Sequence, residues 1–516
     1  MNTNLKYILF SALVCATSTA VAQDSYDAQN FSNSDLNGTS RFVSMGGALG
    51  ALGGDISVMS TNPAGTAMYR KSDAAITLSG LFVEKEAMDH DRSRMSLDQG
   101  GAVITFDMDN PTSKGLQFVN FGVNYQKKRN FFSNQITNIQ NLDGDKAQSW
   151  QIADLASFAL DNNCWNGLIV DLAIDPNPKT REGIIINGPL ENANYDEAKY
   201  NWLDVNTLPR VYDGVGADAA YYERATKGAN IQADINVSFN VSDQFFFGAS
   251  VGVYDIDYSR ESFYQETGID GNFYDWTNWY KTKGDGIDVK LGFICRPIED
   301  SPFRFGVSVH TPIWYRLTDS NGTTLFYNDR QVGYRDNAEY DYNFRTPWKF
   351  GVSLGHTIGK NFAIGAEYEF QDLSTAHYSD VDNQDKEYFR NINQWTKQTL
   401  RGQHTLKVGA EFKPIDEFSI RAGYNFVSSP FKKDAYRAIG YDGVYSETDY
   451  TNWGPINRFT FGLGYRYKSG YIDIAYQYQM QKGDFFAFRD DNHEPLQATK
   501  IKNNRSQLMA TFGFRF

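Results

Sequence analysis

The chain has 516 residues and a formal net charge of −13, and it combines 37 Phe, 32 Tyr and 44 Gly with a negative mean hydropathy. The acidic balance argues against binding of nucleic acid through its phosphates, so no nucleic-acid partner is expected. A chain so aromatic and yet hydrophilic on average is typical of a barrel whose strands alternate between a lipid face and a polar lumen.

The N-terminus has the features of a secretory signal. Lys6 supplies a positive start, residues 7–14 are apolar, and Ala20-Val21-Ala22 is a small-residue cleavage site. We therefore predict a signal peptide over 1–22. The alternative, a lipidated Cys15, is disfavoured because Val14 precedes it. No later apolar run approaches the ~20 residues of a membrane-spanning helix.

Residues 23–72 lack a strand-like alternation. Their centre, 42–54, is small, apolar and rich in glycine, so it needs a dry environment. A barrel of about fourteen strands is wide enough to contain such a segment. We predict an N-terminal hatch inside the lumen that enters from the periplasmic side. Its apolar side chains are the candidate ligand-binding residues: Phe42, Met45, Leu49, Leu52 and Met59.

From residue 73 onward the sequence alternates with a period of two, most clearly at the C-terminus. There Phe512, Phe514 and Phe516 share one face, and Thr511 and Arg515 share the other. We predict an all-β fold, a transmembrane antiparallel β-barrel over 73–516, with an even number of strands. The fourteen expected segments are 74–83, 102–107, 118–125, 231–239, 245–256, 287–295, 303–310, 348–356, 362–370, 405–412, 418–426, 459–467, 472–481 and 507–516.

The connections between these segments alternate in length. Short ones such as 242–244 and 359–361 are expected in the periplasm, and long ones such as 128–226, 373–398 and 428–456 outside the cell. Both termini are then expected to be periplasmic.

A charge network is predicted in the lumen near the periplasmic mouth. If 469–470 is a two-residue turn, Arg466 faces Asp473 and can form a salt bridge with it. Arg421 and Arg515 lie at a similar depth. We favour a network that stiffens the wall over a site for a substrate carboxylate.

The motif Asn62-Pro63-Ala64-Gly65 lies just before the first strand, after Gly46-Gly47, Gly53-Gly54 and Asp55. In this order and spacing the chain resembles the FadL/TodX family of outer-membrane transporters for long-chain fatty acids and other hydrophobic compounds. In that family the same motif closes an N-terminal hatch. Thr66 replaces the apolar residue that often follows the motif, and the family's acidic pair is reduced to Gly54-Asp55, so the substrate class stays open.

The resemblance implies passive uptake of hydrophobic or amphipathic, fatty-acid-like small molecules through the outer membrane of a Gram-negative bacterium. It also implies contact with outer-membrane lipid, and recognition of the terminal Phe516 by the barrel-assembly machinery. Two alternatives stay open. The first is a docking or shuttle barrel in protein secretion or surface attachment. The second is a polar porin, against which the apolar hatch argues.

No enzyme is predicted, because the sequence has no nucleophile elbow, phosphate loop or paired metal-ligand spacing. No catalytic residue, metal or cofactor is expected. Some FadL-like proteins carry a haemin-receptor label, which makes histidines candidate axial ligands, although an isolated histidine needs no metal to explain it. The candidates are His90, His310, His356, His377, His404 and His493.

Overall fold

The computed structural model describes residues 23–108, 114–140, 142, 148, 217–268, 273–298, 301–327, 330–336, 339–382, 386–437, 447–489 and 496–516. The predicted signal peptide, Cys15 and His493 lie outside these residues. Within these ranges no helix is long and apolar enough to cross a membrane.

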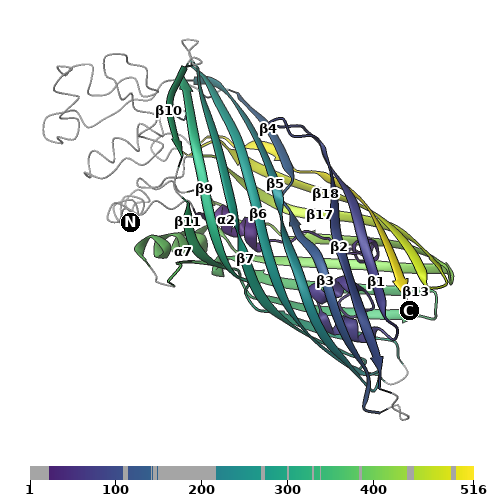
Figure 1. Ribbon diagram of the computed structural model, residues 1–516. Coiled ribbons are helices and arrows are strands. Elements are labelled where there is room, and N and C mark those ends of the chain that lie inside the picture. The colour runs from purple at the N-terminus through teal and green to yellow at the C-terminus, as the bar shows by residue number, and fades with distance from the viewer. Residues whose placement is uncertain are drawn as a thin grey trace, which may run out of the picture.

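The wall is a closed antiparallel barrel of fourteen strands, some of them interrupted (Figure 1). β20 pairs with β1 from Asp73 opposite Arg515 to Val83 opposite Arg505, which closes the barrel. Each of the fourteen predicted segments lies in one wall strand, so the predicted strand number is confirmed. In order the wall strands are β1 (Asp73–Val83), β2 (Ser93–Asp107), β3 (Leu116–Asn130) with β4 (Ser133–Gln140), β5 (Ala217–Val241), β6 (Phe245–Gly268), β7 (Phe273–Cys295), β8 (Arg304–His310) with β9 (Trp314–Tyr327), β12 (Lys349–Ile358) with β11 (Tyr340–Arg345), β13 (Phe362–Asp372) with β14 (His377–Asp380), β15 (Gly402–Ile415), β16 (Phe418–Val427), β17 (Tyr450–Tyr467), β18 (Gly470–Phe486), and β20 (Arg505–Arg515) with β19 (Thr499–Lys502); β10 (Arg330–Asp336) pairs with β9.

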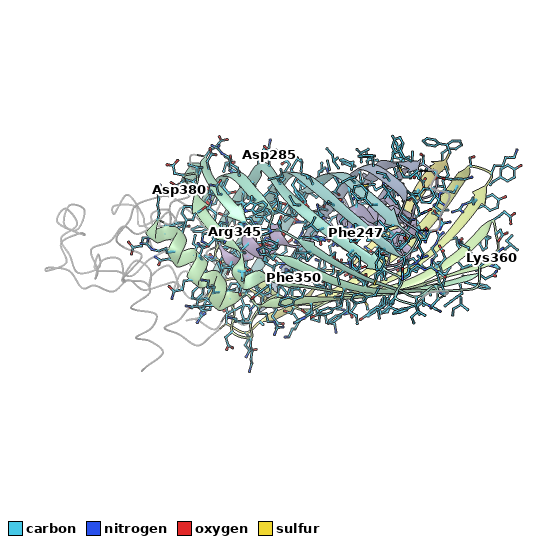
Figure 2. The ribbon with its side chains drawn as sticks, turned by 90° about the horizontal axis from the view of Figure 1, so that it is seen from below. Phe247, Asp285, Arg345, Phe350, Lys360 and Asp380 are labelled. Carbon is cyan, nitrogen blue, oxygen red and sulfur yellow. The ribbon has the colours of Figure 1, made fainter. Side chains whose placement is uncertain are left out.

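An apolar belt surrounds the part of the barrel near the short turns. Outward-facing Phe247 and Phe350 are 45% and 48% exposed and belong to this belt, whereas Asp285 and Asp380 lie nearer the other end (Figure 2). Exposed apolar side chains on every side of a closed barrel are explained by lipid. The belt therefore marks the membrane-spanning part of the wall.

Beyond the belt the polarity of the strands is reversed. β6 is outward-apolar up to Val253, after which Asp255 and Asp257 face outward while Tyr254 and Tyr258 face inward and are buried. Neighbouring strands β5 and β7 continue beside β6 along its length. The barrel thus extends past the membrane on the side of the long connections, with an aromatic interior.

The N-terminal segment lies inside the barrel as α2 (Ser25–Ser32), α3 (Ser40–Ser44), η1 (Ile56–Ser60) and η2 (Pro63–Met68). It starts in the extended half, where Gln23 Nε2 donates to Asp319 Oδ2 at 2.8 Å. It ends at the short turns, where the Ser72 carbonyl accepts the N–H of Phe516. The predicted entry from the short-turn side is therefore wrong, and Gln23 and Phe516 lie in different halves.

Two further elements lie at the long-connection end, inside a predicted loop. η5 (Leu373–Thr375) interrupts the wall strand between β13 and β14, and α7 (Glu387–Thr399) packs against α2, β14 and η5. Phe389 of α7 is buried in the same aromatic cluster as Tyr378. The long connections therefore contribute to the interior of the extended half.

The hairpin between β17 and β18 corrects a predicted register. Tyr467 pairs with Gly470, so the turn is Lys468-Ser469, with Lys468 in the left-handed region at φ 53°. The strands are thereby offset by two residues from the prediction, which keeps every side chain on its predicted face. Asp473 lies opposite Gly464, and the predicted Arg466–Asp473 salt bridge is wrong.

We expect removal of Phe516, or Phe516→Asp, to impair insertion into the outer membrane. Phe516 stacks on Phe514 with ring centroids 6.1 Å apart and is 64% exposed, so it is available to a partner at the end of the closing strand. Heat-modifiable migration of the outer-membrane fraction measures folded barrel. A normal folded level in the variant would contradict recognition of this residue by the assembly machinery.

Candidate functional site

The Asn-Pro-Ala-Gly motif builds a tight turn at the base of the hatch. Asn62 caps η2 by accepting the Ala64 N–H at 3.2 Å, and Pro63 occupies the first helical position, where no backbone donor is needed. A Cβ on Gly65 would lie 2.8 Å from Val58 Cγ2 and 3.2 Å from Gly53 Cα. Asn62, Pro63 and Gly65 therefore each have a local steric or hydrogen-bonding reason.

Inward-facing glycines of the wall seat the hatch. A Cβ on Gly409 would lie 2.2 Å from the Met45 carbonyl oxygen, and one on Gly365 would lie 2.0 Å from that of Ala48. On the other side of the barrel, Gly248 gives the same close approach to the motif. A glycine inside a strand marks a place where another backbone comes close, and here that backbone is the hatch.

The predicted ligand-binding residues lie in the hatch interior. Phe42, Met45, Leu49 and Leu52 share one buried cluster, while Met59 packs in a second. All five are at most 5% exposed. Of these five, Phe42 lines the cavity that lies between the hatch and α2, on the side of the long connections, and the other four do not. Their packing explains how the hatch holds its shape, and a role in ligand binding stays a prediction.

A cavity of about 260 Å³ lies between the hatch and α2. One part of its lining is aromatic or aliphatic, including Phe131, Tyr258 and Ile313, and another part carries many charged side chains. The cavity can therefore accommodate a molecule with an apolar body and a polar end.

Most charged groups at this cavity are paired. Lys290 contacts Asp288 at 2.6 Å, and Lys407 contacts Glu369 at 2.8 Å. Asp35 of the N-terminal segment accepts from Arg505 at 3.0 Å. Burial alone would raise the pKa of Asp35, but Arg505, Arg129 and Arg458 together hold that pKa below its usual value. Charges in these pairs are not available to a ligand without breaking a buried contact.

Two lysines at the cavity differ from the others. Lys128 is 8% exposed, and its buried Nζ has no hydrogen-bond partner within the described chain. Its Nζ lies 5.5 Å from the centroid of the Tyr254 ring. Lys349 also lines the cavity, and the described residues give it no salt bridge. A buried amino group without a hydrogen-bond partner, such as that of Lys128, is costly.

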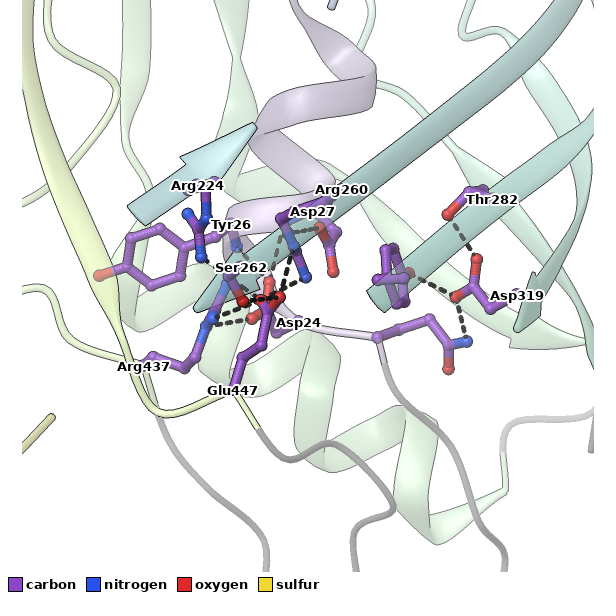
Figure 3. A network of polar contacts seen from close by, with 12 residues as sticks. Asp24, Tyr26, Asp27, Arg224, Arg260, Ser262, Thr282, Asp319, Arg437 and Glu447 are labelled. Carbon is purple, nitrogen blue, oxygen red and sulfur yellow. Dashed lines mark hydrogen bonds and ion pairs between the residues drawn. The ribbon is translucent and has the colours of Figure 1, made fainter. Parts of the chain in front are cut away.

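A polar network holds α2 above the cavity (Figure 3). Asp24 caps α2 and contacts Arg437 Nε at 2.7 Å, while Asp27 lies 3.4 Å from Arg260. Arg260 also contacts Glu447 at 2.7 Å. Burial and the neighbouring Asp24 raise the pKa of Asp27 to about 8, against the effects of Arg260 and Arg437. We call Asp24, Asp27, Arg260, Arg437 and Glu447 the α2 latch.

The predicted charge network at the short-turn end exists with different partners. Arg421, and not Arg466, contacts Asp473, at 2.5 Å, and Arg421 also contacts Glu411 at 2.6 Å. Arg515 contacts Asp73 at 2.9 Å across the closure of the barrel. The Arg421–Glu411 and Arg515–Asp73 pairs join neighbouring strands, and the Arg421–Asp473 pair reaches across β17 at Gly464. A role in stiffening the wall stays a prediction.

Among the described histidines, His310 lines the upper cavity and the others do not. Its Nε2 is 2.6 Å from the Thr61 carbonyl of the hatch. The described residues contain no group of three or more His, Cys, Asp or Glu side chains that could hold a metal ion. His310 is thus engaged with the hatch, and haem ligation stays a prediction without support here.

Sequence reasoning missed Lys128, the α2 latch and the wall glycines. The signal for the glycines was present, since Gly248, Gly365 and Gly409 stand at lumen-facing positions of predicted strands. Lys128 was assigned to a loop, because the outward alternation of β3 ends before it. Lys128 lacks a partner among the described residues because carboxylates at the same cavity, such as Asp288 and Glu369, pair with other lysines. A single sequence does not reveal these pairs.

The fold and the site define a class: a membrane-spanning β-barrel with a plugged lumen and an amphipathic cavity above the plug. No family model matches the sequence, and no curated protein matches it either. Solved structures similar to it include a FadL homologue from Pseudomonas aeruginosa, with 14% identity, TM-score 0.48 and coverage of 94% of this chain and 98% of that chain. The toluene transporter TbuX from Ralstonia pickettii has 13% identity, TM-score 0.48 and coverage of 93% and 99%. The monoaromatic hydrocarbon channel CymD has 10% identity, TM-score 0.49 and coverage of 93% and 98%. At these values the function has to be inferred from the lumen itself.

Proposed function

We propose that this barrel is an outer-membrane channel for passive uptake of hydrophobic or amphipathic small molecules that carry an acidic end. The observation that carries the proposal is the Lys128 amino group, which has no hydrogen-bond partner among the described residues and lies beside the aromatic part of the lumen cavity. A carboxylate would give Lys128 a charge-assisted hydrogen bond, and the hydrocarbon part would pack against Phe131 and Tyr258. The solved FadL homologue, TbuX and CymD have names that agree with hydrophobic cargo.

The proposal includes an orientation. Long connections of bacterial barrels lie outside the cell and short turns in the periplasm. With this orientation Phe516 is periplasmic, the extended half projects outward, and α2 closes the side from which cargo arrives. The hatch then separates the cavity from the periplasm, and both α2 and the hatch must move, at least in part, for passage.

Lys128→Met is expected to weaken binding of oleate to the purified barrel about tenfold or more, because a hydrogen bond to a charged group contributes ~1.5–3 kcal/mol. Binding of oleyl alcohol, which has the same chain without the charge, should change little. The variant without ligand should melt at a higher temperature than the parent, since a buried amino group without a hydrogen-bond partner is removed. Titration calorimetry and thermal unfolding in nanodiscs measure these three quantities.

The matched control is Lys500→Met, which removes an exposed lysine that is paired with Asp484 and does not line the cavity. This variant should bind oleate like the parent. Equal oleate affinity in the Lys128 variant and the parent would remove the basis for an acidic cargo.

The docking alternative is favoured by one observation, the extension of β5, β6 and β7 past the apolar belt as a polar-faced wall. Such a wall offers a surface to proteins outside the membrane. Affinity purification of the solubilised barrel distinguishes the two functions. Recovery of one secreted protein in equal amount supports docking, and recovery of bound lipid without a protein supports transport.

A further inference from the structure

A second cavity, of about 350 Å³, lies on the opposite side of the hatch, at the short-turn end of the barrel. Leu52, Gly53 and Gly54 of the hatch form part of its lining. Arg41 and Phe42 are consecutive residues of α3, and Arg41 lines this cavity while Phe42 lines the upper one. The hatch therefore divides the lumen into two compartments.

The lining of this second cavity is strongly basic, and the carboxylates of Asp55, Asp73, Asp416, Glu417 and Asp473 lie in an adjoining pocket that shares six of its residues. Among the described residues the lining of the second cavity has eight cationic side chains but two carboxylates, Asp243 and Glu411. We call this cavity the basic vestibule. Its cationic side chains are Arg41, Arg70, Arg296, Arg304, Lys413, Arg421, Arg466 and Arg515.

Some of these cations are neutralised within the protein. Arg41 and Arg421 share Glu411, at 3.2 and 2.6 Å. Arg70 contacts Asp243 at 2.9 Å, and Arg515 has Asp73, outside the lining, as its partner. These contacts hold the hatch and the strands in place and leave little capacity for a ligand.

Arg304 is different from these four, because, like Arg296, it has no carboxylate partner within the described chain. Its Nη1 donates to the Leu52 carbonyl of the hatch at 2.7 Å, and its Nε is buried without a hydrogen-bond partner. Arg466 lines the same cavity and is exposed. Asp473, the predicted partner of Arg466, forms its salt bridge with Arg421 instead. At Arg304 the vestibule thus keeps a positive charge for which the described residues supply no carboxylate partner.

A surplus of one charge sign in a narrow cavity raises the local concentration of the opposite ion. Guanidinium groups present two parallel donors that match the two oxygens of a carboxylate. Because Arg304 also binds the hatch backbone, an anion at this position would be next to the moving part of the channel. These features fit a small anion better than a large acidic surface, since Arg304 lies in a cavity between the wall and the hatch and not on an outer face of the barrel.

We propose that the basic vestibule is a second anion-binding site, which receives the carboxylate of an amphiphilic cargo molecule after it passes the hatch. The identity of the cargo rests on the proposed function; the presence of an anion site rests on the vestibule alone. Lys128 and Lys349 bind the acidic end above the hatch, and Arg304 and Arg466 bind it below. The lower site stabilises cargo at the periplasmic mouth and slows its return, without any energy source.

The test is titration of the full barrel, in nanodiscs of zwitterionic phosphatidylcholine, with octanoate as the probe. Octanol is the uncharged comparison and inorganic phosphate the anion without a chain. The parent should show two classes of octanoate site. R304Q/R466Q should weaken one class about tenfold or more and leave the other intact, and K128Q should do the reverse. R304K/R466K keeps the charge but loses the paired donors of the guanidinium groups, so its lower-site affinity should fall between those of the parent and R304Q/R466Q.

R92Q is the control for loss of a positive charge, because Arg92 is exposed and pairs with Glu86 outside the vestibule. Heat-modifiable migration verifies that each variant is folded. Unchanged octanoate binding in folded R304Q/R466Q would overturn the proposal. Inorganic phosphate that binds as tightly as octanoate, with the same dependence on Arg304 and Arg466, would overturn the assignment to an amphiphile. Loss of the lower class in R304Q/R466Q with no effect of K128Q would support the vestibule and contradict the proposed upper site.

Discussion

Gly409→Val is expected to open the lumen to small solutes without unfolding the barrel. The added Cβ would lie 2.2 Å from the carbonyl oxygen of Met45 and 2.7 Å from its carbonyl carbon. These are backbone atoms of the hatch, so no side-chain rotation relieves the clash, and the turn around Gly46 must leave its seat. Valine itself suits a strand, and the wall strands hydrogen-bond to one another, so the barrel persists.

Swelling of liposomes in an isotonic sugar solution measures this opening. The parent should swell slowly, because the hatch and α2 occupy the lumen, and Gly409→Val should swell several-fold faster. Gly100→Val on β2 is the matched control, since a Cβ there meets no atom within 4 Å. If the two variants swell at the same rate, the hatch is not the barrier, and rapid swelling of the parent would favour the polar porin.

The wall could be predicted because lipid imposes a one-sided pattern on every strand. Ile472, Ile474 and Tyr476 of β18 follow this pattern and are between 45% and 48% exposed. The lengths of β5, β6 and β7 could not be predicted, because the rule reverses outside the membrane. After Val253 the apolar side chains of β6 point inward, so the predicted segment stops at residue 256 although the strand continues to Gly268.

The hatch could be recognised from the sequence, but its position against the wall strands could not be predicted. Its glycines and the Asn62 turn have local reasons that a sequence shows, whereas its position depends on wall residues hundreds of positions away, such as Gly409. The same limit explains why the predicted salt bridge between Arg466 and Asp473 is wrong. Two turns that differ by two residues put the same side chains in the lumen, and only the backbone of Lys468 decides which carboxylate each arginine meets.

The direction of the N-terminal segment was also beyond reach of the sequence. Tyr26 and Phe31 were not distinguished from the glycine-rich part that follows, yet they pack among the aromatic side chains of the extended half. Phe31 makes edge contacts with Phe131 and Tyr258, at centroid distances of 6.3 and 5.8 Å. The sequence does not predict the extended half, so it offers no aromatic surface against which α2 could be expected to pack.

Arg260→Gln is expected to release α2 from the extended half. Arg260 is 4% exposed and contacts Asp27 and Glu447, so its loss leaves two buried carboxylates with fewer cations. Removing one partner of a buried ion pair costs about 3–5 kcal/mol, which is comparable to the stability of a short docked helix. Hydrogen–deuterium exchange of the peptide 23–32, corrected for intrinsic rates, should rise strongly while the wall strands stay protected.

Protonation of Asp27 gives this prediction a pH dependence. The pKa of Asp27 is raised to about 8 when α2 is docked. In the released segment its pKa is expected near the ordinary value of about 4. Between these two pH values Asp27 is protonated in the docked state and ionised in the released state, so docking takes up a proton. This contribution to docking is complete at acidic pH and is lost as the pH rises through about 8. Exchange of 23–32 should therefore be faster at pH 9 than at pH 6 in the parent, and the difference should be larger in Arg260→Gln.

Asp27→Asn separates the latch from other effects, because asparagine resembles the protonated carboxyl group and cannot titrate in this range. Combined with Arg260→Gln, it should restore much of the protection of 23–32 and remove most of the pH dependence, since the unpaired charge at α2 is gone. Met45→Asp, which damages the hatch but leaves the α2 latch intact, should leave this exchange unchanged. If the double variant exchanges as fast as Arg260→Gln alone, at both pH values, the Asp27–Arg260 pair does not hold α2, and the aromatic packing of Phe31 has to account for its position.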